Sequence, residues 1–192
     1  MTNTENFEQV PIESRRALRE WLETHHEQND SVWLVTYKKL VPEKYVSREE
    51  VLDELLCFGW IDGIRRKLDT ERTMQLISPR QSDHWAKSYK DRAARLVQEG
   101  LMREPGLAAI RRSKQAGLWD FLDDVDALRV PDDLAAALEA RPEARHHFDG
   151  FPPASRRFVL RWIKLAKKAE TRQKRIDRIA TLAARNERLP GS

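Results

Sequence analysis

The chain has 192 residues, a net charge of +4 and a single cysteine, Cys57. A chain of this length can bury roughly 70% of its unfolded surface, so it needs no disulfide or structural metal to fold. One cysteine excludes an internal disulfide and fits a reducing compartment. No stretch approaches the roughly 20 apolar residues of a membrane span, and the first residues lack a signal-peptide pattern. We therefore expect a soluble, cytoplasmic protein that does not enter a membrane.

The first third of the chain predicts a helix, a strand and a second helix. Residues 12–27 carry apolar side chains at helical spacing after Pro11, a residue that the first turn of a helix tolerates. Residues 31–37 are rich in β-branched and aromatic side chains and too few for a helix, so they predict a strand, expected in the centre of a sheet. Residues 47–50 have the Ser-x-x-Glu pattern of a capping box, ahead of a helix that ends near residues 57–59.

The next residues predict a β-hairpin. From Trp60 to Ser78, two runs with apolar residues flank an acidic turn, which suits two antiparallel strands. Because residues i and i+2 of a strand share a face, Arg65 and Lys67 point one way and Arg66 the other. Only one of these sets can lie on the same side as Asp62.

The chain beyond Pro79 is expected to be helical. Helices are predicted from Trp85 to Val97, before a C-cap at Gly117, after Pro131, Pro142 and Pro152-Pro153, and from Thr171, the expected cap of the last helix. Residues 151–192 hold twelve Lys or Arg and three acids, whereas residues 1–150 hold 23 bases and 28 acids. A basic segment beside an acidic body indicates an anionic partner, a nucleic acid or the body itself, and a solvated pair of basic helices is the simpler alternative.

These elements predict an α+β fold that is mainly α. A small antiparallel sheet of about three strands is packed with helices and followed by a C-terminal helical segment. The Asp-rich segment 122–131, which ends in a proline break, is the expected linker. It separates a mixed α/β core at 1–121 from a basic C-terminal helical part at 132–192.

The strongest candidate for a site is Gly59-Trp60-Ile61-Asp62-Gly63, at the junction between helix and hairpin. The two glycines permit close backbone approach, which could leave the ring of Trp60 and the carboxylate of Asp62 facing a common space. The alternative is structural, with Gly59 as a helix C-cap, Trp60 in the core and Asp62 as a turn acid.

Basic and aromatic residues near this segment predict a pocket for a flat anion. The planar fork of an Arg suits carboxylates and phosphates, and the start of the helix near Trp85 presents backbone N–H groups to anions. Lys67 or Arg65 is expected at the rim, although strand charges also serve to discourage edge pairing. The predicted ligand-binding residues are Trp60, Asp62, Lys67, Arg80 and Trp85.

The sequence predicts no metal site, cofactor or catalytic group. The five histidines lack the i, i+4 spacing of a metalloprotease helix, and the chain contains no Cys-x-x-Cys, Walker, Gly-x-Gly-x-x-Gly or Gly-x-Ser-x-Gly motif. An enzyme that uses Asp62 as acid or base stays open as an alternative. The sequence weighs against it because no second catalytic group accompanies Asp62.

Motifs throughout the chain resemble the bacterial YdeI/OmpD-associated family, also described as bacteriocin-protection proteins. The likeness lies in Cys57-Phe58-Gly59-Trp60-Ile61-Asp62-Gly63, Lys67-Leu68-Asp69, Ser78-Pro79-Arg80, Trp85, and Gly106-Leu107-Ala108-Ala109-Ile110 ahead of Gly117-Leu118-Trp119. The family's C-terminal helical motif is similar to Ser155-Arg156-Arg157, Trp162-Ile163, Ala166-Lys167, Glu170-Thr171-Arg172 and Arg175-Ile176. Ala86 and Tyr89 depart from the family's usual Ser and Asn. The resemblance implies a stress or bacteriocin-protection role and supplies no reaction.

Three functions therefore compete. We expect binding of a small anionic ligand or of a protein partner first, and an enzyme of unknown reaction second. Nucleic-acid binding through the C-terminal helices is third, because basic side chains can contact phosphates but no known docking motif accompanies them. The residues expected to contact nucleic acid are Arg156, Arg157, Lys164, Lys168, Arg172 and Arg175.

Overall fold

The computed structural model describes residues 7–191. The chain divides into two compact units, Met1–Asp120 and Phe121–Ser192, called here the N-terminal and C-terminal units. The segment 122–131, expected to be a linker, falls in the C-terminal unit. It contains a short helix in which Val125 is buried.

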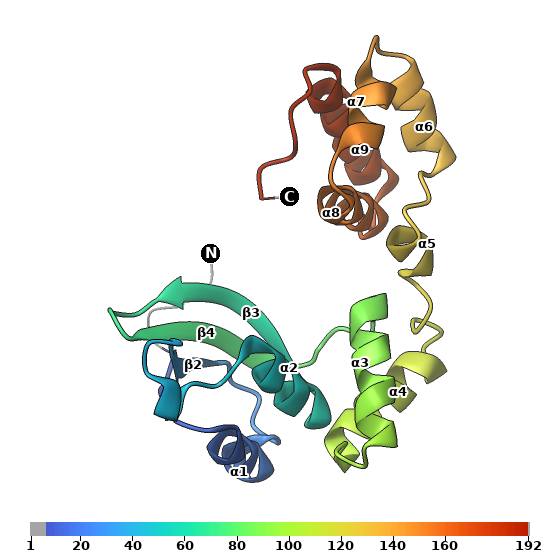
Figure 1. Cartoon of the computed structure of the whole chain (residues 1–192). Helices are drawn as coiled ribbons and strands as arrows, with labels where there is room; N and C mark the ends of the chain where they lie inside the picture. Colours follow the sequence, from blue (N-terminus) through green and yellow to red (C-terminus); the bar gives the residue numbers. More distant parts are fainter. Residues whose placement is uncertain (1–6, 192) are drawn as a thin grey trace. The chain divides into compact units, whose positions relative to one another are not determined.

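The N-terminal unit contains a four-stranded sheet in the order β1-β2-β4-β3 (Figure 1). The strands are β1 (Gln9–Ile12), β2 (Val32–Tyr37), β3 (Trp60–Lys67) and β4 (Arg72–Pro79). β2 and β4 pair antiparallel, as do β4 and β3, whereas β1 runs parallel to β2. The predicted α+β class, the hairpin and the central position of β2 are confirmed. The prediction of about three antiparallel strands missed the parallel strand β1.

The first helix starts later in the structure than the sequence predicted. Residues 9–12 are the strand β1, and helix α1 (Arg15–His25) begins later, with Ser14 as its N-cap. The Ser14 hydroxyl accepts a hydrogen bond of 3.1 Å from the Ala17 N–H. Pro11 has no N–H to donate, and the sheet tolerates it because β1 is an edge strand.

Helices α1 and α2 (Arg48–Cys57) lie on one face of the sheet (Figure 1), and a 3-10 helix, η2 (Pro42–Lys44), precedes α2. The capping box between Ser47 and Glu50 is confirmed. The buried core joins sheet residues to both helices, and its members include Val10, Ile12, Val32, Leu34, Ile77, Leu18, Leu22, Val51, Leu55 and Leu56.

Helices α3 (Lys87–Gln98) and α4 (Glu104–Gln115) complete the N-terminal unit. Trp85, expected inside a helix, precedes α3, whose N-cap is Ala86. The end of α2 packs closely against the start of α4 at two glycines. Gly59 has φ +72°, and a Cβ there would lie 2.9 Å from the Pro105 carbonyl oxygen. A Cβ on Gly106 would lie 2.5 Å from the Cys57 carbonyl oxygen. Gly59 therefore follows the end of α2, as expected, and also lets α4 approach closely.

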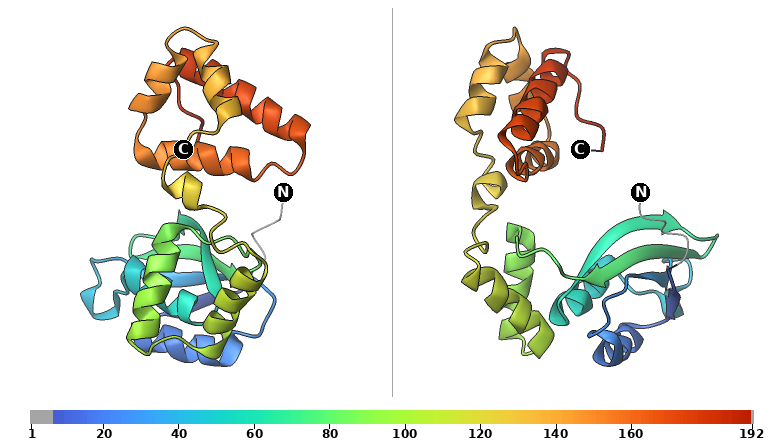
Figure 2. Two further views of the ribbon diagram at one scale, coloured as in Figure 1. Left: turned by 90° about the vertical axis from the view of Figure 1, so that its right-hand side faces the viewer. Right: turned by 180° about the vertical axis from the view of Figure 1, so that it is seen from behind.

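The C-terminal unit is helical in its described part (Figure 2). Its helices are α5 (Asp123–Asp126), α6 (Asp132–Glu139), α7 (Ala144–Gly150), α8 (Pro153–Lys164) and α9 (Ala169–Ala184). The buried side chains of these helices include Val125, Leu134, Leu138, Phe148, Leu160, Ile163, Ile176 and Ile179. The prediction that Thr171 caps the last helix is wrong, because α9 begins two residues earlier with Lys168 as N-cap.

Candidate functional site

Asp62 sits in a polar cluster where β3, β4, α2 and α3 meet. Its Oδ2 accepts a 3.1 Å hydrogen bond from Gln75 Nε2 and lies 3.9 Å from Arg48 Nη2. Its Oδ1 accepts a hydrogen bond from the Tyr89 hydroxyl. Burial, together with this bond to Asp62, raises the pKa of Tyr89 to about 12, so the phenol stays a donor at neutral pH. We call Arg48, Asp62, Gln75 and Tyr89 the Asp62 cluster.

Tyr89 links Arg80 and Trp85 to Asp62. The Arg80 guanidinium carbon lies 4.1 Å from the Trp85 ring centroid and 5.4 Å from that of Tyr89. Arg80 Nη1 donates to the carbonyls of Ser82 and His84, at 3.3 and 3.2 Å. Trp85 is completely buried, and its indole N–H has no hydrogen-bond partner among the described residues. The structure therefore brings Asp62, Arg80 and Trp85 into one packed group.

Trp60 is a core residue, and Lys67 lies at a distance from Asp62. The Trp60 side chain is 1% exposed, and its indole N–H donates to the His26 carbonyl at 3.3 Å, so its ring belongs to the core. Lys67 is exposed at the far end of β3, five residues beyond Asp62. At about 3.3 Å per strand residue, that separation is about 16 Å.

A β-bulge between Asp62 and Arg65 settles which basic residues share the face of Asp62. Asp62 pairs with Ile77 and Arg65 with Gln75, so β3 holds one residue more than β4 in this interval. Directly paired residues lie on the same face, which places Arg65 and Lys67, not Arg66, on the side of Asp62. Arg66 lies on the other face, with its guanidinium 5.2 Å from the Trp33 ring.

Two buried acids on α2 were missed by the sequence analysis. Glu54 accepts hydrogen bonds from Arg15 Nε and Arg19 Nη1, at 2.6 and 2.7 Å. Asp53 accepts from Arg92 and Arg95 of α3. The residues from Leu55 to Phe58 are buried as well, and such a long apolar run indicates a helix enclosed on most sides, where any acid needs partners.

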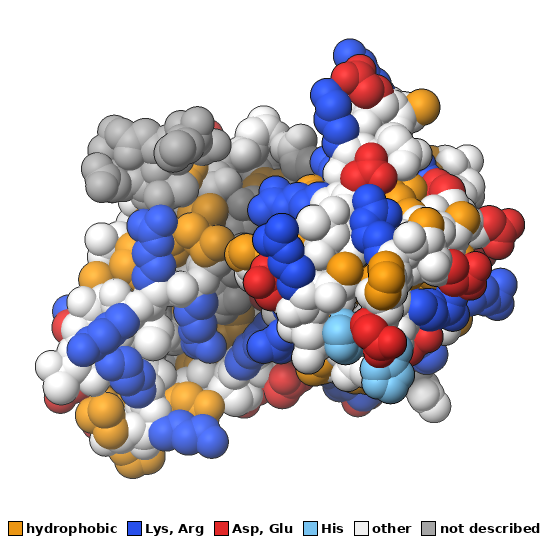
Figure 3. Space-filling model, turned by 90° about the horizontal axis from the view of Figure 1, so that it is seen from above, with side chains coloured by type: hydrophobic (Ala, Val, Ile, Leu, Met, Phe, Trp, Pro, Cys, Tyr) orange, Lys and Arg blue, Asp and Glu red, His pale blue; other side chains and the backbone are white. Residues whose placement is uncertain are grey.

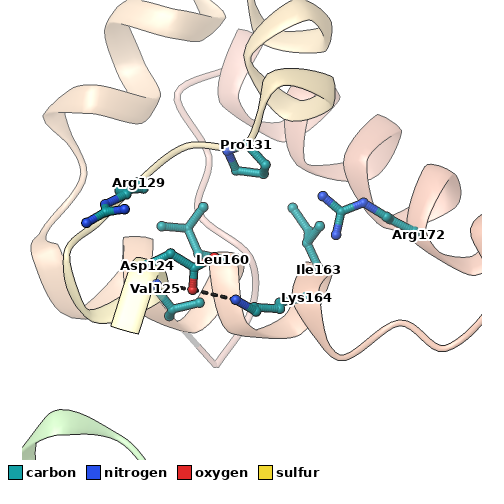
Figure 4. Close-up of a pocket in the computed structure, with 8 residues that line it drawn as sticks. All are labelled: Asp124, Val125, Arg129, Pro131, Leu160, Ile163, Lys164 and Arg172. Atoms are coloured by element: carbon teal, nitrogen blue, oxygen red, sulfur yellow. Dashed lines mark hydrogen bonds and ion pairs between the residues drawn. The ribbon is translucent and has the colours of Figure 1, made fainter. Parts of the chain in front are cut away.

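The C-terminal unit contains a pocket of about 120 Å³ (Figure 4). Its lining comes from α5, the segment before α6, α8 and α9, and comprises Asp124, Val125, Arg129, Pro131, Leu160, Ile163, Lys164 and Arg172. In Figure 4 the Arg172 side chain points toward the space between Pro131, Ile163 and Lys164. Arg129 lies at the opposite edge, with its guanidinium directed away. Two of the predicted phosphate-contacting residues, Lys164 and Arg172, thus line one pocket.

Ion pairs hold both of these cations at the rim. Lys164 Nζ lies 2.5 Å from Asp124 Oδ1, and Arg172 donates to both oxygens of Asp133, at 2.6 and 2.9 Å. Although burial opposes it, the hydrogen bond from Lys164 lowers the pKa of Asp124. The hydrogen bonds from Arg172 likewise lower the pKa of Asp133. Both acids are therefore ionised at neutral pH.

The other predicted phosphate contacts do not join that pocket. Arg156 pairs with Asp149 and lies 5.6 Å from the Phe148 ring, and Arg175 lies 4.9 Å from the Trp162 ring. Arg157 and Lys168 are exposed. The acids that offset the basic side chains of α8 and α9 come from the region of α5 to α7, because residues 121–150 contain eight acids and three bases.

The surface carries many cations in both units. Figure 3 shows Lys and Arg side chains spread over the face in view, with apolar and acidic side chains between them. Residues 7–191 hold no group of three or more His, Cys, Asp or Glu side chains placed to bind a metal ion. Every helix within that range is too short or too polar to span a lipid bilayer.

Comparison with known families divides the chain much as the structure does. The family model described as Domain of unknown function (DUF8412) matches residues 10–109, more than half of the chain. The model described as Bacteriocin-protection, YdeI or OmpD-Associated matches residues 127–186, which include the C-terminal motifs noted from the sequence and most of the pocket lining. No curated protein and no solved structure matches the chain. The chain therefore belongs to the DUF8412 family and carries a YdeI/OmpD-associated region in its C-terminal unit.

Proposed function

We propose that the protein binds a small anionic ligand in the pocket of the C-terminal unit. The observation that carries this proposal is that Lys164 and Arg172, from two different helices, line one pocket with apolar walls. Small-molecule sites combine apolar walls with polar groups that orient the ligand, and this lining joins four apolar residues to four charged ones. We assign this binding to a cytoplasmic stress or bacteriocin-protection role, and the description of the matched family supports the bacteriocin-protection part of this assignment.

Both cations keep donors for a ligand after their ion pairs are counted. Arg172 uses Nε and Nη2 on Asp133, so its Nη1 edge still presents N–H groups. Lys164 has three N–H donors, and one of them is directed at Asp124. An oxyanion in the pocket can therefore accept charge-assisted hydrogen bonds without displacing either acid.

The predicted set in the N-terminal unit supports ligand binding less well. Trp60 and Trp85 are buried, and the carboxylate of Asp62 already accepts hydrogen bonds from Gln75 and Tyr89. These contacts explain the residues as a packed junction between sheet and helices. The C-terminal pocket is the better candidate because its cations retain exposed donors.

Titration of the full-length ¹⁵N-labelled chain with sodium acetate or sodium phosphate tests the proposal by NMR. We expect saturable shifts in the amides of residues 124–131 and 160–172 with at least one anion, and smaller shifts as sodium chloride is added. The Arg172→Gln variant should bind at least tenfold more weakly, because it loses the charged fork that faces the pocket.

The matched control is Arg178→Gln, which removes an exposed Arg from the same helix outside the pocket lining. It should bind like the unmodified chain. Equal losses in both variants would show general attraction to a basic surface, and the absence of saturable shifts with every anion would refute the proposed function.

A further inference from the structure

We infer that the outer side of α8 is a docking surface for an acidic, amphipathic helix of a partner protein. This side of the helix is called here the α8 face, and it comprises Ala154, Arg157, Phe158, Arg161 and Leu165, all of which are exposed. None of the five lines the C-terminal pocket, so the α8 face is independent of the proposed function.

The α8 face exposes two large apolar side chains. Its residues follow the spacing i, i+3, i+4, i+7 and i+11, which places them on one side of a helix. Phe158 is 44% exposed and Leu165, the C-cap of α8, is 37% exposed. In the described part of the C-terminal unit, no other large apolar side chain is as exposed. The core side of α8 is already formed by buried residues such as Val159 and Ile163, so these two apolar side chains serve a second contact.

Positive charge surrounds this apolar pair. Residues 150–169 contain six Lys or Arg and no Asp or Glu. The neighbouring helix α9 differs, because it carries acids among its bases, and Lys174 Nζ lies 2.7 Å from Glu170. Such mixed charges are typical of a helix that faces water. The uniformly basic α8 face instead favours a partner of negative charge.

The arginines of the α8 face have donors to offer. Arg161 forms no hydrogen bond or ion pair within residues 7–191. Arg157 donates from Nε to the Asp126 carbonyl oxygen at 3.5 Å, which leaves the N–H groups of its two Nη atoms. A carboxylate accepts paired hydrogen bonds from such a planar fork. Asp or Glu side chains of a partner are therefore well suited to both arginines.

The combination of charge and apolar contact favours a helix over other partners. A second copy of the chain would bring like charges together, and phosphates would leave Leu165 without a contact. A lipid surface requires apolar groups that enter by about 5–10 Å, whereas Phe158 and Leu165 are each more than half buried. These two residues are seven positions apart, about 10.5 Å along the axis. Apolar residues at i and i+7 of a partner helix have the same separation.

Titration of the full-length ¹⁵N-labelled chain with a synthetic helical peptide tests this inference. The peptide has about 20 residues, with Leu along one side and Glu along the other. Saturable shifts are expected in the amides of residues 154–168, and the affinity should fall as sodium chloride is added. A peptide of the same composition, with Leu distributed around the helix, should bind about tenfold more weakly, because it cannot cover Phe158 and Leu165 together.

Variants of the chain identify the contribution of each kind of contact. Phe158→Ala and Arg161→Gln should each weaken binding of the amphipathic peptide about fivefold. The matched controls are Val97→Ala, at an exposed apolar residue of α3, and Arg178→Gln, at an exposed Arg of α9. Both controls should bind like the unmodified chain. Circular dichroism of every variant checks that its helices are intact.

Three results would overturn the inference. Equal affinities for the two peptides, or unchanged affinity in Phe158→Ala, would reduce the interaction to attraction between opposite charges. Tighter binding of duplex DNA, single-stranded DNA or phosphatidylglycerol vesicles than of the amphipathic peptide would assign the α8 face to a nucleic acid or a lipid surface. The absence of saturable shifts with the amphipathic peptide would show that the α8 face faces only water.

Discussion

The two units of the chain use ion pairs in different ways. In the N-terminal unit, the Asp53 and Glu54 side chains are 8% and 1% exposed, and two arginines hold each of them. In the C-terminal unit, the Asp124 and Asp133 side chains are 44% and 42% exposed, and the structure gives each a single basic partner. Pairs of the first kind join α2 to α1 and α3, and pairs of the second kind hold Lys164 and Arg172, two of the residues that line a pocket.

The difference follows from solvation. A buried carboxylate loses its water and needs both arginines, so removal of the acid or of a partner leaves an uncompensated charge in the interior. A half-exposed pair contributes little to stability, because water competes for both members. The ion pairs at the rim of the C-terminal pocket can therefore open at little cost, whereas the arginine pairs of α2 cannot.

The largest expected effect is that of Glu54→Gln. This change leaves the charges of Arg15 and Arg19 without their shared acid, and we expect a loss of about 3–5 kcal/mol in the free energy of unfolding. Chemical denaturation followed by tryptophan fluorescence reports on this unit, which contains five of the six tryptophans. Glu20→Gln, which breaks an exposed pair with Arg16, is the control and should cost less than about 1 kcal/mol. Equal losses would remove the distinction between buried and exposed pairs.

Tyr89→Phe should cost about 1.5–3 kcal/mol at neutral pH, because Asp62 loses a hydrogen bond to its charged oxygen. Burial raises the pKa of Tyr89 from 10.0 to about 12, so its contribution is complete below pH 10 and is lost as the pH rises toward 12. Denaturation of both proteins across this range should show the difference shrinking. A difference that stays constant up to pH 12 would contradict this assignment of the raised pKa.

Glycine substitutions should act with opposite signs in the two units. Gly106→Ala should cost about 1–3 kcal/mol, because its Cβ would lie 2.5 Å from the Cys57 carbonyl oxygen. Gly150→Ala, in α7, should stabilise the C-terminal unit by about 0.5–1 kcal/mol, because a Cβ there meets nothing within 4 Å. Hydrogen exchange measured residue by residue assigns each effect to its unit. A neutral Gly106→Ala would show that α2 and α4 can move apart.

The smallest effect is expected at the pocket rim. Asp133→Asn should cost less than about 1 kcal/mol at neutral pH. Arg172 lowers the pKa of Asp133 below its ordinary 3.8, so the contribution is present above that pH and disappears as the pH falls through the lowered value. Thermal unfolding of both proteins at neutral and strongly acidic pH measures this difference. A loss as large as that for Glu54→Gln would place Asp133 among the fixed pairs.

Local patterns predicted much of the fold. The capping box at Ser47, the hairpin and the central strand β2 depend on neighbouring residues, and the structure contains all three. β1 escaped prediction because it is only four residues long and gains its stability from a distant partner, β2. Pro11 also fits a helix start as well as an edge strand, so its local signal was ambiguous.

The candidate sites were less predictable, because they depend on side chains from distant parts of the sequence that meet only in the folded chain. The basic character of Lys164 and Arg172 was plain in the sequence, but their common pocket requires α5, α8 and α9 to pack together. The contact between Arg48 and Asp62 depends likewise on how α2 meets β3. Alternation along the strand correctly separated Arg66 from Arg65 and Lys67, but it could not relate either set to Asp62, because the bulge lies between them.

That bulge also determines how the hairpin tolerates changes in length. One residue of β3 between Asp62 and Arg65 has no counterpart in β4, so its deletion would restore a regular ladder and keep every other pair in place. A deletion farther along β3 would instead exchange the two faces of the residues beyond it. Homologues one residue shorter in this hairpin should therefore lack a residue at position 63 or 64, and an alignment that places the gap elsewhere would misassign the basic side chains.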